Sequence, residues 1–381
     1  MQVIDRAQAI RYRLHVNHLT ARLPAGAYDV AARCGLQDSW PRSGLISLAA
    51  RVESCRADAW EDPRLVQTYS PRAAVHLLPA DDLGVFTIGR LPADPAARRV
   101  IEDDAERICR ALGGRARRTA DLPPELRDGL RGATATGRIV IRWDARSLRI
   151  REHPQPAMDA REAAIELARR HLHHYGPTTP ALFARWSGQS PADARGVWRH
   201  LAVELAPVSV EGSQAWILAA DEECLGTAPA HIGVRLLPAE EMRLLEFAGT
   251  GQVRPPLADT FHPHGLLVDG VLAGAWAAAA GGSPSACPAP RRCRHSTRRS
   301  RRYRFRDAVH PWRSPKARRS GEVVAERPRR SQRPHRSLEV GDVVDDVADA
   351  DGCHLGHPTS RACSTRGGSA KYDPIAARQR V

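Results

Sequence analysis

The stretch DAREAAIELARRHLHHYGPTTPALFARWSGQSPADARGVWRHLAVELAPVSVEGSQAWIL, residues 159–218, has the clearest secondary-structure pattern in the chain. Asp159 can cap a first helix, whose apolar residues mostly recur at helical spacing until Gly-Pro at 176–177 stops it. A threonine at 178 or 179 can cap a second, short helix that ends at Gly188.

A third helix and a hairpin complete this stretch. Proline at the first helical position after Ser190 starts the helix, and its apolar stripe consists of Val197, Trp198, Leu201 and Leu205. Two short alternating runs around residues 208–210 and 216–218 then indicate the strands of a hairpin. Three helices followed by a hairpin is the order of a winged helix-turn-helix, whose third helix commonly enters the major groove of DNA.

Weaker versions of the same order occur twice nearer the N-terminus. In the first, we predict helices at residues 5–21, 28–34 and 44–52, followed by strands at residues 65–69 and 73–78. In the second, we predict helices at residues 97–113 and from 123, followed by a hairpin of residues 138–143 and 147–150. After the third unit, residues 231–276 look mostly β, with candidate strands over 234–237 and 265–271.

The predicted fold class is α+β, mostly α, with tandem winged helix-turn-helix units, a small β region and a basic tail. The predicted divisions are a first unit over residues 1–90, a second over 91–155, a third over 156–225, a β-rich segment over 226–276 and a tail over 277–381. We expect the tail to have no fold of its own, because it lacks helical or strand periodicity.

The formal net charge of +14 is concentrated in this tail. Residues 1–276 contain 34 Arg against 33 Asp and Glu, whereas residues 277–381 contain 23 Lys and Arg against 10 Asp and Glu. A basic protein usually favours nucleic acid as a partner, but here the charge says nothing about the folded part. Two accounts of the tail stay open: a disordered polybasic segment that holds phosphate by counterion release, or a shifted reading frame of a GC-rich gene. The amino-acid composition changes abruptly after residue 276, just after a predicted strand that should lead into another, and this favours the frame shift.

Several function classes are disfavoured by what the sequence lacks. No stretch approaches about 18 consecutive apolar residues, and no export signal is visible, so we expect no membrane partner and a cytoplasmic, nucleoid-associated protein. The eight cysteines include no C-x-x-C pair, and the Cys and His residues at 353–363 match no zinc module, so we expect free thiols and no metal. No glycine-rich loop is followed by GK[ST], which argues against a nucleotide phosphate site.

Five segments of the first three quarters of the chain resemble one bacterial family in consistent order. They are GLQDSWPR (35–42), LISLAAR (45–51), TYSPRAAVHL (68–77), YGPTTPALFARWSG (175–188) and LLVDGVLAGAW (266–276). Together they are similar to the winged-helix family whose best understood members are the AlkZ/YcaQ crosslink-repair DNA glycosylases. The resemblance implies tandem winged helices that cup double-stranded DNA, and excision of alkylated or crosslinked purines without a metal or another cofactor. We expect a monomer that has double-stranded DNA as its partner.

The resemblance also implies where the chemistry lies. Active members carry a Gln-x-Gln or Gln-x-Asp pair that orients and supports the attacking water, and here Gln37 matches the first position while Ser39 stands at the third. A serine hydroxyl can hold a water but cannot act as a carboxylate base. Asp38 lies between the two and is the third catalytic candidate. It would point another way if the segment is extended, and it could compensate for Ser39 only if the backbone turns it toward the same pocket. The structural alternative is that Ser39 caps a helix that has Pro41 just inside it.

Candidate DNA contacts come from the matching segments and from the third helix of the clearest unit. They are Arg42, Arg72, His76, Arg185, Arg195, Arg199 and His200. The alternative for each is an ordinary polar surface or a structural histidine, because most arginines of an Arg-rich chain are solvated or lie in local ion pairs. The basic, His-rich end of the first helix, residues 169–174, is accounted for by the helix dipole alone.

Three hypotheses for function follow from these observations. The first is a winged-helix DNA-binding protein that acts as a monofunctional DNA N-glycosylase through Gln37. The second is a non-catalytic DNA-binding or regulatory protein on the same scaffold, because Ser39 replaces the amide or acid of active members. The third is a damaged gene product that folds poorly, because a truncated β region leaves strand edges unpaired.

Overall fold

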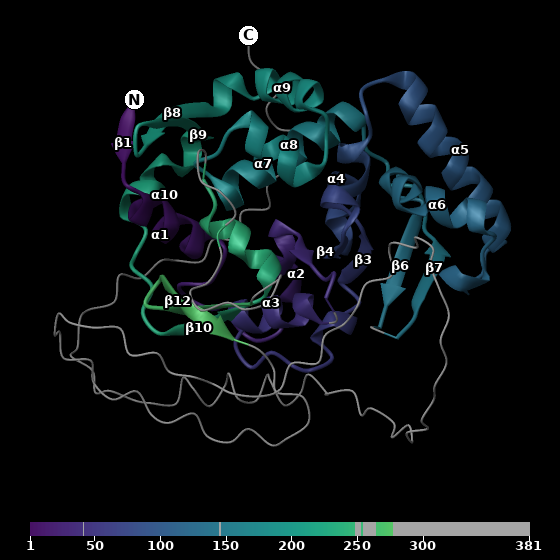
Figure 1. Ribbon diagram of the computed structural model, residues 1–381, viewed down its shortest axis with the longest axis horizontal. Helices are drawn as coiled ribbons and strands as arrows, with labels where there is room; N and C mark the ends of the chain where they lie inside the picture. Colours follow the sequence, from purple (N-terminus) through teal and green to yellow (C-terminus); the bar gives the residue numbers. More distant parts are fainter. Residues whose placement is uncertain (41, 145, 248–252, 254–263, 277–381) are drawn as a thin grey trace, which may run out of the picture.

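The computed structural model describes residues 1–40, 42–144, 146–247, 253 and 264–276 (Figure 1). The predicted tail over residues 277–381 lies outside them, and so does the Cys- and His-containing segment at 353–363. Within the described ranges, helices and several sheets alternate along the chain, which confirms the mixed α+β class.

Residues 159–218 fold into the helices and the hairpin that their pattern predicts. The helices are α7 (Ala160–Tyr175), α8 (Pro180–Ser187) and α9 (Pro191–His200), and the hairpin consists of β8 (Leu205–Val210) and β9 (Ser213–Leu218). Asp159, Thr179 and Ser190 cap the three helices by accepting hydrogen bonds from backbone amides of the first turn. Apolar and aromatic side chains of all three helices share one buried core.

The N-terminus of the chain packs against this part of the fold. β1 (Gln2–Ile4) pairs in parallel with β8, so that Gln2 lies opposite Val208 (Figure 1). α1 (Arg6–Val16) begins after the capping residue Asp5 and packs against α10 (Glu222–Thr227). Apolar residues of β1, α1, β8, β9 and α10 form a common buried cluster.

The hairpins predicted for the first two units join in one six-stranded sheet, in the order β2-β4-β3-β6-β7-β5. Its strands are β2 (Leu36–Gln37), β3 (Leu65–Tyr69), β4 (Val75–Pro79), β5 (Arg117–Arg118), β6 (Ile139–Trp143) and β7 (Leu148–Glu152). The two hairpins meet where Gln67 of β3 lies opposite Ile141 of β6. The arrangement in tandem winged-helix units and the domain boundaries stay predictions.

Short and long helices surround this sheet. α5 (Pro95–Leu112) and α6 (Pro124–Ala133) pack together and bury apolar residues against β6 and β7 (Figure 1). α2 (Tyr28–Ala31) and α3 (Ser43–Arg51) share a core with β2 and β4, and α4 (Leu83–Thr87) packs against α7. The short 3₁₀ helices are η1 (Ala32–Cys34), η2 (Ala59–Glu61), η3 (Pro71–Ala73), η4 (Ala80–Asp82), η5 (Ile88–Arg90), η6 (Thr119–Asp121), η7 (Thr134–Thr136), η8 (Ala202–Glu204) and η9 (Ala219–Asp221).

A three-stranded antiparallel sheet ends the described chain. It consists of β10 (Val234–Leu237), β11 (His264–Val268) and β12 (Val271–Trp276). The strand predicted over residues 234–237 is confirmed, whereas the single strand predicted over 265–271 ends at Val268, and a turn at 269–270 leads into β12. Between β10 and β11 the chain forms a 3₁₀ helix, η10 (Ala239–Leu245), in a segment for which the sequence predicted mostly β structure.

A buried ion pair joins α3 to η10. Arg51 Nη2 lies 2.9 Å from Glu241 Oε2, and the two side chains are 0% and 9% exposed. Arg51 also donates to the carbonyl of Ser47 within α3. A buried charge is strongly unfavourable without its partner, so this pair fixes η10 against α3.

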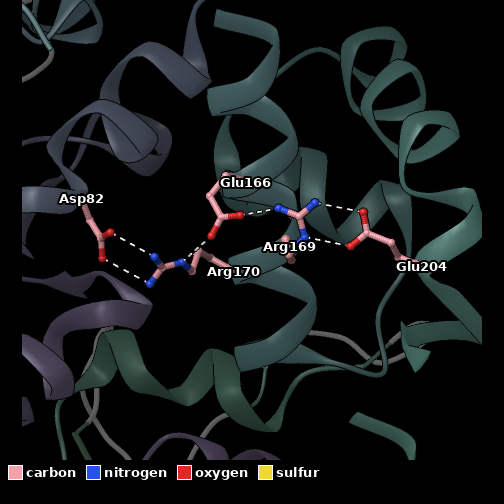
Figure 2. Close-up of polar contacts among 5 residues, drawn as sticks. All are labelled: Asp82, Glu166, Arg169, Arg170 and Glu204. Carbon is pink, nitrogen blue, oxygen red and sulfur yellow. Dashed lines mark hydrogen bonds and ion pairs between the residues drawn. The ribbon is translucent and has the colours of Figure 1, made fainter. Parts of the chain in front are cut away.

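A chain of ion pairs connects α7 to its neighbours on both sides (Figure 2). Arg170 contacts both carboxylate oxygens of Asp82 at 3.0 and 3.2 Å, and Arg169 contacts both oxygens of Glu204 at 2.8 and 2.9 Å. Glu166 contacts both arginines. These bidentate pairs give the basic end of α7 a structural role, because they tie the helix to η4 and η8.

In the described ranges, none of the helices is both long and apolar enough to span a bilayer. The same residues bring no three His, Cys, Asp or Glu side chains into a group that could hold a metal ion. Cys34, Cys55, Cys109 and Cys224 are free thiols there.

The Arg51–Glu241 pair provides a test of the packing between α3 and η10. Arg51→Met leaves Glu241 buried without its partner, so we expect a loss of about 3–5 kcal/mol in the free energy of unfolding by urea. The double variant Arg51→Met/Glu241→Met removes both charges and should recover most of that loss. The control Arg56→Met breaks an exposed pair with Asp58 and should have no measurable effect. A double variant as unstable as the single one would contradict this account.

Candidate functional site

β2 places Gln37 and Ser39 on one side of the backbone and Asp38 on the other. The strand forms an edge of the six-stranded sheet, where Gln37 lies opposite His76 and the Asp38 amide donates to the carbonyl of Val75 at 2.8 Å. Alternate residues of an extended strand face opposite sides. Gln37 Nε2 accordingly donates to Ser39 Oγ at 3.0 Å, while Asp38 turns into the interior and is 1% exposed.

The Asp38 carboxylate holds β2, α3 and β3 together. Oδ1 accepts from the Gly44 amide at 2.9 Å, in the first turn of α3, and Oδ2 accepts from Gln67 Nε2 at 2.6 Å. Glycine suits position 44, because a Cβ there would lie 3.2 Å from the Asp38 side chain. Burial raises the pKa of Asp38 to about 6, although these hydrogen bonds favour the charged form.

The expectation that Ser39 caps the next helix is wrong. α3 begins at Ser43, and Ser39 Oγ accepts its hydrogen bond from Gln37. The first turn of α3 is bound by the side chain of Asp38. Pro41, which the same expectation placed inside the helix, lies outside the described residues.

Two guanidinium groups fix the orientation of the Gln37 amide. Arg72 Nη2 donates to Gln37 Oε1 at 2.6 Å, and Arg243 Nη1 donates to the same oxygen at 2.9 Å. A guanidinium has donors and no acceptor, so the carbonyl oxygen must face the arginines and the amide nitrogen must face Ser39. Among the described residues, the second N–H of Gln37 has no acceptor, and it is free to meet a ligand.

Arg72 reaches Gln37 from a strained backbone. Its φ is 57° and that of Ala73 is 55°, a left-handed conformation that costs a residue with a Cβ about 1 kcal/mol or more. Arg72 Nη1 donates to the carbonyl of Trp186 at 2.7 Å, and Gly188 ends α8 so close to Arg72 that a Cβ there would lie 3.1 Å from the Arg72 backbone. Burial, together with the charge of Arg243, lowers the pKa of Arg72 to about 10. Packing against α8 therefore holds this cation in place.

A cavity of about 250 Å³ lies beside the two arginines that hold Gln37. Its described lining contains four guanidinium groups, Arg13, Arg72, Arg185 and Arg243, against one carboxylate, Glu246. The rest of the lining consists of His171, Tyr175, Thr178, Leu182 and Trp186. A cationic cavity with aromatic walls suits an anionic ligand that carries planar rings.

Two of the four arginines are committed to the scaffold. Arg13 donates to the backbone carbonyls of residues 176, 177, 244 and 246 at 2.6–3.0 Å, and burial lowers its pKa to about 9. Arg185 pairs with Glu246 at 2.7 Å. Arg72 and Arg243 have no carboxylate partner among the described residues, so they supply the unneutralised charge of the cavity.

Two further hollows continue from the cavity along α8 and α9, which lie side by side (Figure 1). One, of about 510 Å³, shares Arg185 with the cavity and extends to Arg195. The next, of about 360 Å³, shares Arg195 and extends to Arg199, with Trp198 and Trp216 in its lining. The structure therefore arranges three of the candidate DNA contacts along one path that leads from the cavity to α9.

The other candidates for DNA contact are arranged differently. His200 is exposed at the end of α9, with Nδ1 3.1 Å from a guanidinium nitrogen of α7. His76 is buried opposite Gln37, and burial lowers its pKa well below the ordinary value, so the ring is neutral. Arg42 is the residue directly before α3, and its guanidinium carbon lies 3.4 Å from the centroid of the Trp60 ring.

No pattern in the sequence had pointed to Arg243 or Gln67 as site residues. Arg243 lies among Met242, Leu244 and Leu245, which favoured β structure, and the three-residue spacing of polar positions 240, 243 and 246 was the available signal for a 3₁₀ helix. Gln67 stands in an otherwise ordinary strand, and its role depends on partners from β2 and β6.

The fold and the site define an α+β protein that holds a fixed amide beside a cationic, aromatic-lined cavity. The chain belongs to the AlkZ-like DNA glycosylase family, because the family model described as DNA glycosylase AlkZ-like matches residues 30–286. This confirms the resemblance seen in the sequence and a DNA-glycosylase-like role in DNA repair.

Among solved structures, the chain is similar to the Streptomyces sahachiroi DNA glycosylase AlkZ. The TM-score is 0.60 and the identity is 20%, over 73% of this chain and 88% of that chain, so the likeness concerns the fold. A search of curated proteins found no match.

Asp38 provides a pH test of the site. Its pKa is raised from 3.8 to about 6, so the folded state binds the proton more tightly than the unfolded state does, and the stability that Asp38 contributes falls as pH rises from about 4 to 6. We expect the stability of Asp38→Asn relative to wild type to increase over this interval, by up to about 3 kcal/mol. Urea unfolding at half-unit pH steps measures the difference. A difference that does not change with pH would show that Asp38 is not perturbed in this way.

Proposed function

We propose that this protein hydrolyses the N-glycosidic bond of alkylated or crosslinked purines in double-stranded DNA, and that Gln37 positions the attacking water. The observation that carries the proposal is the Gln37 amide, which Arg72 and Arg243 hold in one orientation beside the cationic cavity. Family membership supplies the class of reaction, and the geometry of this chain supports the assignment of residues.

The chemistry requires little more than positioning and electrostatic stabilisation. An N7-alkylated purine already carries positive charge, so its C1′–N9 bond breaks without further protonation of the base. The sugar then develops oxocarbenium character, and a water must lie in line with C1′. The free N–H of Gln37 donates to that water, and Ser39 Oγ holds it from the neighbouring position. Because Arg72 and Arg243 prevent rotation of the amide, the water has one defined position.

DNA binding is proposed along the path of cations on α8 and α9. In this proposal α7, α8, α9 and the β8–β9 hairpin act as a winged helix, with Arg195, Arg199 and His200 of α9 towards the duplex. Arg185 and Arg72 continue the path to Gln37, where the phosphates next to the lesion bind.

The two remaining candidates have different roles in this proposal. Arg42 contributes charge from the β2–α3 turn, where its guanidinium stacks on Trp60. The neutral, buried His76 supports the strand opposite Gln37 and does not neutralise a phosphate.

A non-catalytic DNA-binding protein is the second candidate function. The observation that favours it is the lack of a proton acceptor in the motif itself. Gln37 Oε1 already accepts hydrogen bonds from two guanidinium groups, and Ser39 stands in place of an acid. Salt-dependent binding of duplex DNA without release of a base would support this candidate.

Gln37→Ala tests the proposed enzyme. Wild type should release N7-methylguanine from duplex DNA in single-turnover assays, and the variant should be slower by about 10²–10³-fold because the water loses its positioning donor. Gln155→Ala, an exposed glutamine in the loop between β7 and α7, serves as the control and should match wild type. Equal rates for Gln37→Ala and wild type would remove Gln37 from the reaction.

Arg195→Ala and Arg199→Ala test the proposed DNA path. Each should weaken duplex binding and reduce the slope of log Kd against log salt concentration by about 1, because one phosphate contact and its released counterion are lost. Arg110→Ala, on the exposed face of α5, should leave both quantities unchanged. If neither α9 variant alters the slope, the duplex does not follow α9.

A further inference from the structure

The attacking water loses a proton during hydrolysis, and a group that accepts this proton speeds the reaction. The residues at the motif do not supply one. Gln37 Oε1 already accepts from two guanidinium groups. The Ser39 hydroxyl accepts from the Gln37 amide and is too weakly basic to hold a proton. Asp38 faces the interior, where both of its oxygens are hydrogen-bonded. The acceptor must therefore come from another element.

η10 and the residue that follows it carry three ionisable side chains at a spacing of three, and the middle one, Arg243, contacts Gln37. Residues three apart in a 3₁₀ helix lie one above another. Glu240, Arg243 and Glu246 have this spacing, and they are partly exposed while the residues between them are buried. Arg243 contacts Gln37 and Glu246 lines the cavity, so Glu240 extends the same face in the opposite direction from the cavity.

Among the described residues, Glu240 is the carboxylate of this segment that forms no ion pair with an arginine. Glu241 pairs with Arg51, and Glu246 pairs with Arg185. Glu240 Oε2 is buried and has no hydrogen-bond partner among the described residues. A buried carboxylate oxygen is unfavourable without a partner, which points to a ligand at this position.

We propose that Glu240 is the catalytic base of the glycosidic hydrolysis and takes the carboxylate role that Ser39 cannot fill; this inference rests on the proposed function. Glu240 accepts a proton from the water held by Gln37 while the water oxygen bonds to C1′. The C1′–N9 bond breaks, and its electron pair neutralises the alkylated purine, which leaves uncharged. The proton on Glu240 then passes to solvent. The carboxylate also stabilises the positive charge that develops on the sugar.

The electrostatic surroundings of Glu240 suit a base that works near neutral pH. Burial, with the carboxylates of Glu241 and Asp38, raises the pKa of Glu240 to about 7 against the opposing charge of Arg243. A general base is most effective when its pKa lies near the working pH. Because the base acts in its deprotonated form, the rate falls as pH drops below about 7.

The first test measures release of N7-methylguanine from duplex DNA by the full chain between pH 5 and 8.5. We expect the wild-type rate to fall about tenfold per pH unit below about 7. Glu240→Gln should lose this pH dependence and about 10²–10⁴-fold in rate. Glu222→Gln, exposed on α10, is the control and should keep both the rate and the profile. An unchanged rate or profile in Glu240→Gln would overturn the inference.

A second test requires no turnover and separates the inference from the proposed function. It compares binding of duplexes in which a cationic pyrrolidine or a neutral tetrahydrofuran replaces one deoxyribose. Wild type and Glu222→Gln should prefer the pyrrolidine duplex by about tenfold or more, and Glu240→Gln should lose this preference. Equal binding of the tetrahydrofuran duplex by all three proteins shows that the variant is folded.

The two tests distinguish the possible failures. In one case, wild type releases no base but prefers the pyrrolidine duplex, and Glu240→Gln loses that preference. This result would contradict the proposed function and would still place Glu240 opposite the sugar. In the other case, wild type releases the base, but either it does not prefer the pyrrolidine duplex or Glu240→Gln keeps that preference. This result would contradict only the role of Glu240 and not the proposed function.

Discussion

The Asp38 carboxylate is the group on which the arrangement around Gln37 depends. It lies between β2 and α3 and accepts one hydrogen bond from α3 and one from β3. Its β3 partner, Gln67, also accepts from the Trp143 amide at 2.9 Å, so a single buried carboxylate connects three strands and a helix. With Asp38 held inward, the alternation of an extended strand turns Gln37 and Ser39 to the opposite side, where Gln37 meets the two arginines.

Positive charge is concentrated at the cavity beside Gln37, although the folded part as a whole is close to neutral. Residues 1–276 are close to neutral, with 34 Arg against 33 Asp and Glu, yet the cavity beside Gln37 has four guanidinium groups against one carboxylate. Several acidic side chains pair with arginines elsewhere in the fold, as in the pairs that Arg169 and Arg170 form with their neighbours. Burial reduces screening by salt and water, so the local excess attracts an anion although the folded part as a whole does not.

Local features could be predicted from the sequence, and contacts between distant segments could not. The caps Asp159, Thr179 and Ser190 lie within the range that the pattern gave, because capping depends on neighbours three residues away. The single pairing of Gln67 with Ile141, which merges two hairpins into one sheet, has no local signal. The same division holds at the site.

Gln37, Ser39 and Arg72 were candidates through the family resemblance, and the structure brings them together. Arg243, 206 positions from Gln37, could not be found in that way, because its 3₁₀ helix is short and its apolar neighbours favoured a strand. The pairing of β1 with β8 is a contact of the same kind, between segments roughly 200 residues apart. At about 5–20 residues per second, a ribosome needs roughly 10–40 seconds between making one and making the other. β1 therefore stays without its partner strand until β8 has been made, roughly 200 residues later.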